Sequence, residues 1–363
     1  MLSRYDIGVF YLGKYTSLIG PPKSMSDLAE LLENRFRVKR CKNIEPQKNY
    51  NNINPESTKS PKKKRFMGNI IKFLKSNQFT YDLYILYILV AFNLKVLFFY
   101  FFNPNAKIII TQPFLILNFF RSIRSNVIYI RRANSCFGVR ELSARKSYAK
   151  KAFDKVFFKY GVRDLVYLVP QSNNVSAYKV IPNHFHAEWL PKYIERDIIK
   201  VFYVGTWCSR KGGDYFLKIF KKAIDGVNAE VFGGLGSDNI LNNELLDSKV
   251  ISYRGVVDKP YSLMACGDVF MSTSRVEGLQ RSLVESMLSG CLVLAFERPD
   301  SLFLSESPGV FLCSEDSVMT ILEKITALDL SDRLQLGRLN RQYAINHFSS
   351  DVVLDKWTEL LNG

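Results

Sequence analysis

Apolar residues come in short runs that are separated by polar loops. In the first half of the chain, runs at 6–12, 38–41, 107–111, 127–130 and 165–169 have the length and Val/Ile/Phe content of buried strands. Apolar residues at helical spacing predict a helix that begins at Ser26, as its N-cap, and runs to about Phe36. Strands that alternate with helices predict a parallel, doubly wound α/β sheet.

The same alternation begins again in the second half of the chain. Strands are expected at 201–204, 229–232, 250–255, 269–272 and 292–295, with helices at 215–223 and 349–361. We therefore predict two Rossmann-like domains. Residues 1–183 would form the first, 184–196 a linker, and 197–346 the second, followed by a C-terminal helix in 347–363.

The most apolar stretch covers residues 81–102 but carries Asp82, Asn93 and Lys95. A lysine at the centre of a membrane-spanning helix costs about 2.5–3.5 kcal/mol. The favoured interpretation is a buried strand at 83–87 followed by a helix at 91–102. Just before this stretch, residues 66–75 show the pattern of a basic amphipathic helix, which could pack on the sheet or lie on a membrane surface.

Charge is distributed unevenly over the 363 residues, whose net charge is +16. Residues 1–180 hold 31 Lys/Arg and 10 Asp/Glu, a net charge of +21. Residues 181–363 hold 19 and 24, a net charge of −5. The first half is therefore expected to face an anionic partner, such as an acidic membrane, a phosphorylated lipid or nucleic acid.

Cysteine and histidine positions argue against a disulfide framework and against a zinc site. The six cysteines are scattered without a Cys-x-x-Cys pair, and no Cys/His cluster occurs. The first ten residues lack the apolar core of a signal peptide. A cytoplasmic protein is expected.

Residues 274–294 carry the most informative chemistry. Glu277 and Glu285 bracket a turn that opens a short helix, and Gly290 closes this helix before an apolar strand. The N-terminus of a helix attracts phosphate through its unpaired N–H groups and its dipole. A carboxylate one turn inside can reach sugar hydroxyls. The segment predicts a site for a ligand that carries both phosphate and sugar.

Several motifs together resemble those of the retaining GT-B glycosyltransferases of group 1, also called family 4. The pair Glu277-x7-Glu285 with Ser282-Leu283 is the strongest element. The others are Val204-Gly205 with Lys211-Gly212, Ile181-Pro182-Asn183, and Ala265-x-x-Asp268. The resemblance is good over about 180–350 and covers the first half only in outline. It implies a retaining hexosyltransferase that uses a nucleotide-sugar donor. It also implies that the two domains face each other across a cleft, with 1–183 as the acceptor-binding domain and 197–346 as the donor domain. The helix in 347–363 would pack back on the N-terminal domain.

The resemblance also implies roles for individual residues. Lys211 would contact the donor diphosphate, Glu285 the ribose, and Glu277 the donor sugar, with Glu277, Lys211 and Arg210 as the catalytic set. The donor site would comprise Gly205, Thr206, Lys211, Gly233, Arg254, Val256, Glu277, Gly278, Ser282, Leu283 and Glu285. The N-terminal loops and acceptor side would comprise Gly20, Lys23, Arg131, Arg132 and Asn134; Arg131 and Arg132 fit either acceptor contacts or surface charge.

No cofactor is expected, because cations and helix N–H groups can stabilise a leaving diphosphate without a metal. UDP is preferred over GDP as the donor nucleotide. The family usually has Arg where this chain has Thr206, and Arg210 or Arg275 could supply that charge.

The preferred function is synthesis of a bacterial surface polysaccharide on a glycan or polyprenyl-diphosphate acceptor, at the inner face of the cell membrane. The alternatives are a catalytically weak partner subunit and, less favoured, a nucleic-acid-binding protein.

Overall fold

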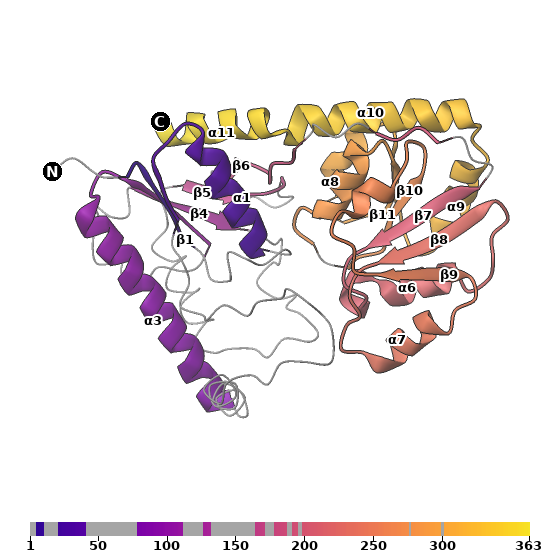
Figure 1. The fold of residues 1–363 in the computed structure, drawn as a ribbon, viewed down its shortest axis with the longest axis horizontal. Helices are drawn as coiled ribbons and strands as arrows, with labels where there is room; N and C mark the ends of the chain where they lie inside the picture. The colour runs from indigo at the N-terminus through magenta and orange to yellow at the C-terminus, as the bar shows by residue number, and fades with distance from the viewer. Residues whose placement is uncertain are drawn as a thin grey trace, which may run out of the picture. The chain divides into compact units, whose positions relative to one another are not determined.

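The computed structural model describes residues 5–10, 21–40, 78–111, 126–131, 164–170, 178–186, 191–194, 198–275, 277–298 and 301–363. These residues form two six-stranded sheets (Figure 1). Clustering of contacts divides the chain into two compact units, one of Met1–Ile130 with Ser143–Val166 and the other of Arg131–Leu142 with Tyr167–Gly363. Each unit is an α/β unit, as the sequence predicted.

The first sheet has the strand order β2-β1-β3-β4-β5-β6. Its strands are β1 (Ile7–Phe10), β2 (Val38–Arg40), β3 (Lys107–Ile110), β4 (Val127–Arg131), β5 (Asp164–Tyr167) and β6 (Lys179–Val180). The pairs β1–β2, β1–β3 and β3–β4 are parallel. The helices described here are α1 (Pro21–Glu33) and α3 (Gln78–Phe102).

The helix α1 begins at Pro21, so the predicted start at Ser26 is wrong. Pro21 and Pro22 belong to its first turn. Proline suits that turn, because the N–H that it lacks would have no partner within the helix. Gly20 lies outside the described residues.

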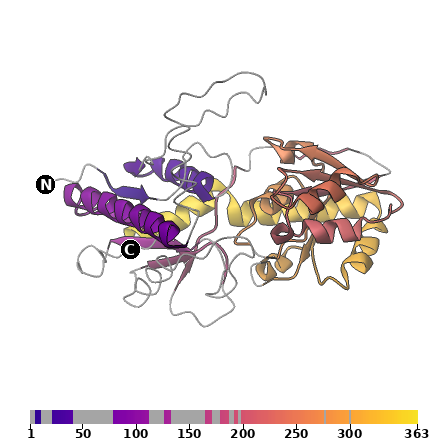
Figure 2. The same ribbon diagram turned by 90° about the horizontal axis from the view of Figure 1, so that it is seen from below.

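The helix α3 is one continuous element of 25 residues, so the predicted strand at 83–87 is wrong. Its side chains Phe92, Val96 and Phe99 are buried against one face of the first sheet, in a cluster with Phe10 and Ile108. Figures 1 and 2 show α3 running alongside this sheet. Among the residues that the structure describes, no helix has the length and apolar character needed to cross a membrane.

The second sheet has the strand order β12-β11-β10-β7-β8-β9, and all of its pairs are parallel. Its strands are β7 (Ile199–Val204), β8 (Val227–Phe232), β9 (Ile251–Gly255), β10 (Val269–Ser272), β11 (Leu292–Phe296) and β12 (Val310–Cys313). The order reverses between β7 and β10, which is the switch point of a doubly wound sheet, where ligands bind at the carboxyl ends of strands.

Helices cover this sheet. They are α6 (Gly213–Ile219), α7 (Asn239–Leu246), α8 (Arg281–Leu288), α9 (Val318–Thr326) and α10 (Leu330–Phe348). The last helix, α11 (Ser350–Asn362), follows α10. Short 3₁₀ helices are η2 (Ser209–Lys211), η3 (Pro260–Leu263) and η4 (Leu302–Glu306). Apolar side chains of α6, α7 and α9 share one core cluster with the sheet, whereas α8 packs on β10, β11 and α10. The sequence analysis did not predict α7, α9, α10 or β12.

A buried asparagine ties α10 to the second sheet. Asn340 is fully buried, and its Nδ2 donates to the carbonyl oxygens of Cys291 (2.8 Å) and Gly309 (2.9 Å). Its Oδ1 accepts from the hydroxyl of Ser307. Since every polar atom of this amide has a partner, its hydrogen bonds offset the cost of removing it from water, and it fixes how α10 lies on the sheet.

Candidate active site

Two loops meet at the switch point of the second sheet. The first follows β7 and contains Gly205, Thr206 and η2. The second follows β10 and leads into α8. The Ser282 hydroxyl donates to the Val204 carbonyl oxygen (3.1 Å), and the Thr273 hydroxyl donates to the Gly212 carbonyl oxygen (2.8 Å). The predicted loops therefore form one site.

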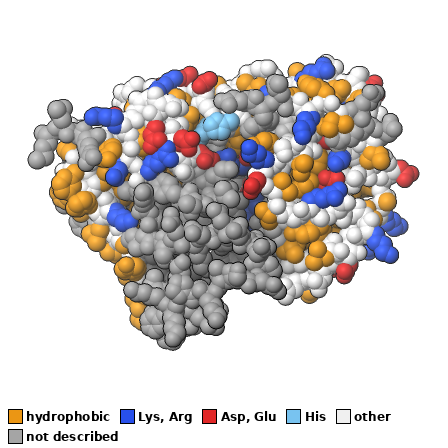
Figure 3. All heavy atoms as spheres, in the orientation of Figure 1, with side chains coloured by type: hydrophobic (Ala, Val, Ile, Leu, Met, Phe, Trp, Pro, Cys, Tyr) orange, Lys and Arg blue, Asp and Glu red, His pale blue; other side chains and the backbone are white. Residues whose placement is uncertain are grey.

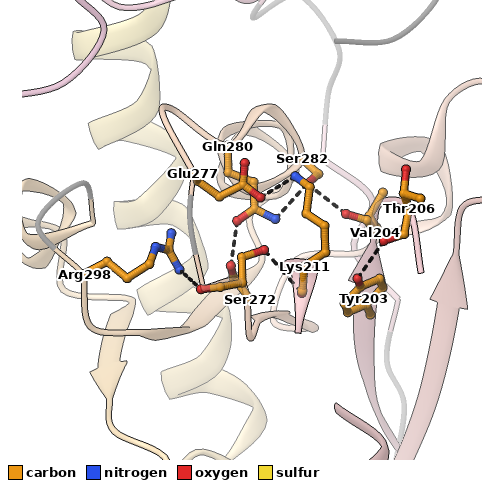
Figure 4. Close-up of polar contacts among 10 residues, drawn as sticks. Tyr203, Val204, Thr206, Lys211, Ser272, Glu277, Gln280, Ser282 and Arg298 are labelled. Atoms are coloured by element: carbon orange, nitrogen blue, oxygen red, sulfur yellow. Dashed lines mark hydrogen bonds and ion pairs between the residues drawn. The ribbon is translucent and has the colours of Figure 1, made fainter. Parts of the chain in front are cut away.

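Lys211 and Glu277 form an ion pair within this site (Figure 4). The lysine Nζ donates to Glu277 Oε1, and the two side chains are only 19% and 10% exposed. Because a partly buried pair is weakly screened by water, this contact fixes both side chains. A cation and a carboxylate thus lie side by side where the sequence predicted the diphosphate and the donor sugar.

Buried hydrogen bonds hold the loop that carries Glu277. The Ser272 hydroxyl donates to Gln280 Oε1 (2.6 Å), and Gln280 Nε2 donates to Ser282 Oγ (3.3 Å). Arg298 is buried and donates to the carbonyl oxygen of Ser274 (2.9 Å). Figure 4 shows these contacts around the Lys211–Glu277 pair. The sequence analysis missed Ser272, Gln280 and Arg298; Gln280 lies inside the motif, but nothing in the sequence pattern marks Arg298.

The tyrosine at the end of β7 orients the first loop. Tyr203 donates its hydroxyl to the carbonyl oxygen of Thr206 (3.0 Å). Burial raises the pKa of Tyr203 well above its usual value, and the charges of Cys208 and Glu277 add to this shift. The phenol therefore stays protonated and keeps its donor role.

Arg275 is one of the two residues that could supply the positive charge missing at Thr206, but its side chain is bound to other residues. Its guanidinium makes two hydrogen bonds to the carboxylate of Asp214 (2.8 and 2.6 Å) and lies over the ring of Tyr215 at 4.2 Å. Burial alone would raise the pKa of Asp214, but the hydrogen bonds and the charge of Arg275 hold it below its usual value. Arg210 is exposed, and only its backbone carbonyl contacts Arg275. Of the two candidates, Arg275 has its side chain engaged with Asp214, whereas the side chain of Arg210 is exposed.

The N-terminal end of α8 lies beside these loops. The N–H of Leu283 donates to the carbonyl oxygen of Gln280 (3.2 Å), and the Leu283 side chain is 1% exposed. Glu285 lies one helical turn after Arg281. Its carboxylate is 3.8 Å from the guanidinium of Arg281, and its side chain is 17% exposed. The motif therefore forms a loop and helix N-terminus, as the sequence indicated.

The predicted base-side residues lie at the ends of β8 and β9. Gly233 has a φ of 143°, and a side chain there would collide with the backbone oxygen of Gly205. Arg254 is bound to Glu230 (3.2 Å), and the exposed Val256 follows β9. A glycine is thus required at Gly233 for the β7 and β8 loops to approach each other.

The residues predicted for the acceptor side belong to the first half of the chain. Arg132 and Asn134 lie outside the described residues. Lys23 lies in the first turn of α1 and Arg131 at the end of β4, and only their backbone is described. Within the described residues, no group of three or more His, Cys, Asp or Glu side chains could hold a metal ion.

His184 is buried rather than at the surface. Burial, together with the charges of His186 and Arg281, lowers its pKa to about 4. The unfolded chain therefore binds one more proton than the folded protein between about pH 4 and 6.5. The contribution of His184 to the free energy of unfolding is therefore fully present above about pH 6.5 and is lost as the pH falls towards 4.

We expect the free energy of unfolding to lose about 2 kcal/mol through His184 between about pH 7 and pH 5. His184→Gln should remove this part, because glutamine does not titrate. Urea unfolding of both proteins at the two pH values measures the difference. His347→Gln, as a control, should keep the full dependence; equal pH dependence in the wild type and His184→Gln would contradict the assignment.

Comparison with known proteins identifies the fold and the family that this chain is similar to. The family model "Glycosyl transferases group 1" matches residues 199–329. Sucrose-phosphate synthase from Thermosynechococcus elongatus has a similar structure over 98% of both chains (TM-score 0.66, 14% identity). HepE of Anabaena, in complex with UDP and glucose, is similar over 99% of this chain and 100% of its own (TM-score 0.57, 14% identity). The two units together have the GT-B fold of glycosyltransferases.

The stretch 199–329 is thus similar to the group 1 glycosyltransferases, and the match covers less than half of the chain. The curated poly(ribitol-phosphate) alpha-N-acetylglucosaminyltransferase of Staphylococcus aureus (strain COL) is 23% identical over 191 residues. These residues make up 50% of this chain, and the match spans only 37% of the length of the relative. The expectation of a GT-B protein related to the group 1 glycosyltransferases is confirmed.

Proposed function

We propose that the chain transfers a sugar from a UDP-sugar to a glycan or a polyprenyl-diphosphate-linked acceptor, with retention of configuration. The observation that carries this proposal is the Lys211–Glu277 pair at the switch point. The names of two similar proteins support it: one is a poly(ribitol-phosphate) alpha-N-acetylglucosaminyltransferase, and the other is in complex with UDP and glucose. The product would be a bacterial surface polysaccharide.

In the proposed reaction, the sugar–phosphate bond breaks and negative charge develops on the leaving UDP. Lys211 and Arg210 stabilise this charge as cations, and the first-turn N–H groups of α8 aid them. The acceptor hydroxyl attacks the anomeric carbon from the side on which UDP departs. The leaving phosphate takes the hydroxyl proton, which gives retention. No step requires a metal, so turnover should persist in the presence of a chelator.

The carboxylates bind the donor in this proposal. Glu277 accepts hydrogen bonds from hydroxyls of the donor sugar, and Glu285 accepts them from the ribose. The loops at Gly233, Arg254 and Val256 flank the uracil. The residues Gly20, Lys23, Arg131, Arg132 and Asn134, from the basic first half, take the acceptor side. We further propose that this half attaches the protein peripherally to the inner face of an anionic membrane.

A binding experiment tests the donor site. UDP at a hundredfold excess over its dissociation constant should stabilise the folded protein by about 2.7 kcal/mol, which thermal unfolding detects. Glu285→Gln should weaken UDP binding by about tenfold or more, because a hydrogen bond to a charged group contributes roughly 1.5–3 kcal/mol. Glu244→Gln on the exposed face of α7 is the matched control.

The outcomes separate the candidate functions. Failure of every UDP- and GDP-sugar to stabilise the protein would contradict the proposal. UDP binding without sugar transfer would favour the catalytically weak partner subunit, an alternative that Thr206 keeps open. NMR of the product's anomeric centre tests retention.

A further inference from the structure

One face of α3 is apolar and exposed along the whole helix. Every described side chain of α3 that is exposed is apolar or aromatic, and these nine side chains are between 37% and 73% exposed. They are Phe79, Leu83, Leu86, Tyr87, Val90, Leu94, Phe98, Phe101 and Phe102. Because they recur at intervals of three or four residues, they form a single stripe about 35 Å long. Figure 3 shows apolar side chains gathered along the edge of the molecule that α3 occupies.

The opposite side of α3 already has its packing partner. Phe92, Val96 and Phe99 are 0–7% exposed and belong to the core of the first sheet. The helix is therefore apolar on both sides, although only one side contacts the sheet. A helix that is hydrophobic all round is normally buried on all sides. An exposed apolar stripe of this size indicates an interaction surface.

The charge of the first half decides between a lipid surface and a second copy of the chain. Residues 1–180 carry a net charge of +21. Two copies that met through this half would repel each other, whereas a negatively charged lipid surface would attract its Lys and Arg residues. Four consecutive basic residues, 62–65, precede α3 by only 12 positions in the sequence. Seven of the nine exposed side chains are Phe or Leu, residues typical of the apolar face of helices that lie in the plane of a membrane surface.

We infer that the exposed stripe of α3 is a lipid-binding surface that lies in the plane of an anionic membrane. The stripe would enter the boundary between headgroups and acyl chains, to a depth of about 5–10 Å. The other face of α3 would stay on the sheet, so the helix would lie on the membrane and not cross it. This inference rests on the peripheral association proposed above and assigns it to particular residues.

Vesicle co-sedimentation of the full chain tests this surface. Vesicles of phosphatidylcholine with phosphatidylglycerol should bind the protein, and vesicles of phosphatidylcholine alone should bind it much less. The double substitution Leu94→Glu/Phe98→Glu should reduce the partition coefficient at least about tenfold, since it removes two apolar side chains from the stripe and adds two negative charges. The matched control is Ile240→Glu/Leu246→Glu on α7, which replaces two exposed apolar residues of the second unit.

A second measurement does not depend on the folding of the glutamate variant. Phe98→Trp keeps the stripe apolar, and brominated lipids should quench its added fluorescence when anionic vesicles are present. Equal loss of vesicle binding in the α3 and α7 variants, or no quenching, would overturn the inference. A dimer in sedimentation velocity that Leu94→Glu/Phe98→Glu abolishes, without vesicle binding, would also overturn it.

UDP binding, measured on the same proteins, distinguishes the two proposals. Leu94→Glu/Phe98→Glu should bind UDP like the wild type, because α3 belongs to the first unit and the Lys211–Glu277 pair to the second. Vesicle binding by a protein that binds no nucleotide would leave this inference standing while the proposed function fails.

Discussion

Replacing Lys211 with alanine is expected to reduce the turnover of a UDP-sugar by about 100- to 1,000-fold. The reason is that the Lys211 ammonium group lies in the loop that would receive the leaving diphosphate, 19% exposed and fixed by Glu277. Charge that develops on the phosphate would lose its nearest fixed cation. Release of UDP from the donor, with or without acceptor, measures the effect.

Lys218→Ala serves as the matched control, because Lys218 is an exposed lysine on α6 in the same domain. Its turnover should match that of the wild type. Lys211→Arg keeps the positive charge and should recover part of the lost rate. If Lys211→Ala turned over the donor as fast as the wild type does, the proposed role of Lys211 would be wrong.

Replacing Gly212 with alanine is expected to destabilise the protein by more than about 3 kcal/mol. Gly212 has a φ of 74°, and a Cβ atom there would lie only 1.9 Å from the carbonyl oxygen of Thr273. The backbone following β10 would have to move, which would separate the two loops of the site. Urea unfolding measures the loss of stability, and UDP release measures the loss of turnover.

Gly226→Ala separates the cost of the left-handed backbone from the cost of the collision with Thr273. Gly226 has nearly the same φ, 73°, but nothing lies within 4 Å of its added Cβ. This variant should lose only about 1–2 kcal/mol, which is the cost of the left-handed backbone. Similar losses of unfolding free energy in the two variants would show that the collision with Thr273 does not contribute to the destabilisation.

The sequence predicted the site because the carboxyl ends of parallel strands meet at one edge of a sheet. The Lys211 loop and the Glu277 loop are separated by 66 positions, yet each follows a strand that flanks the switch point. What the sequence could not show are the side chains that hold these loops. Arg298 donates to the carbonyl oxygen of Ser274 and Asp214 accepts two hydrogen bonds from Arg275, and no periodic pattern marks such residues.

Two helices show the limits of hydrophobic periodicity. In α3, apolar residues cover both the packed and the exposed face, so no polar face revealed a helix across 83–87. In α10, most of the buried positions are small or polar: Arg333, Gly337, Asn340 and Ala344. Its packing depends on a hydrogen-bonded amide and on close backbone approach at glycine, and neither feature produces an apolar stripe.

The buried amide of Asn340 also bears on which part of the chain can fold by itself. The group 1 family match ends at residue 329, one position before α10 begins. A fragment cut at that boundary would keep β11 and β12 but expose the side of α8 and β11 that α10 covers. It would also leave the carbonyl groups of Cys291 and Gly309 without the donor that they share. We therefore expect the part of the chain that folds by itself to extend beyond the matched stretch and to include α10.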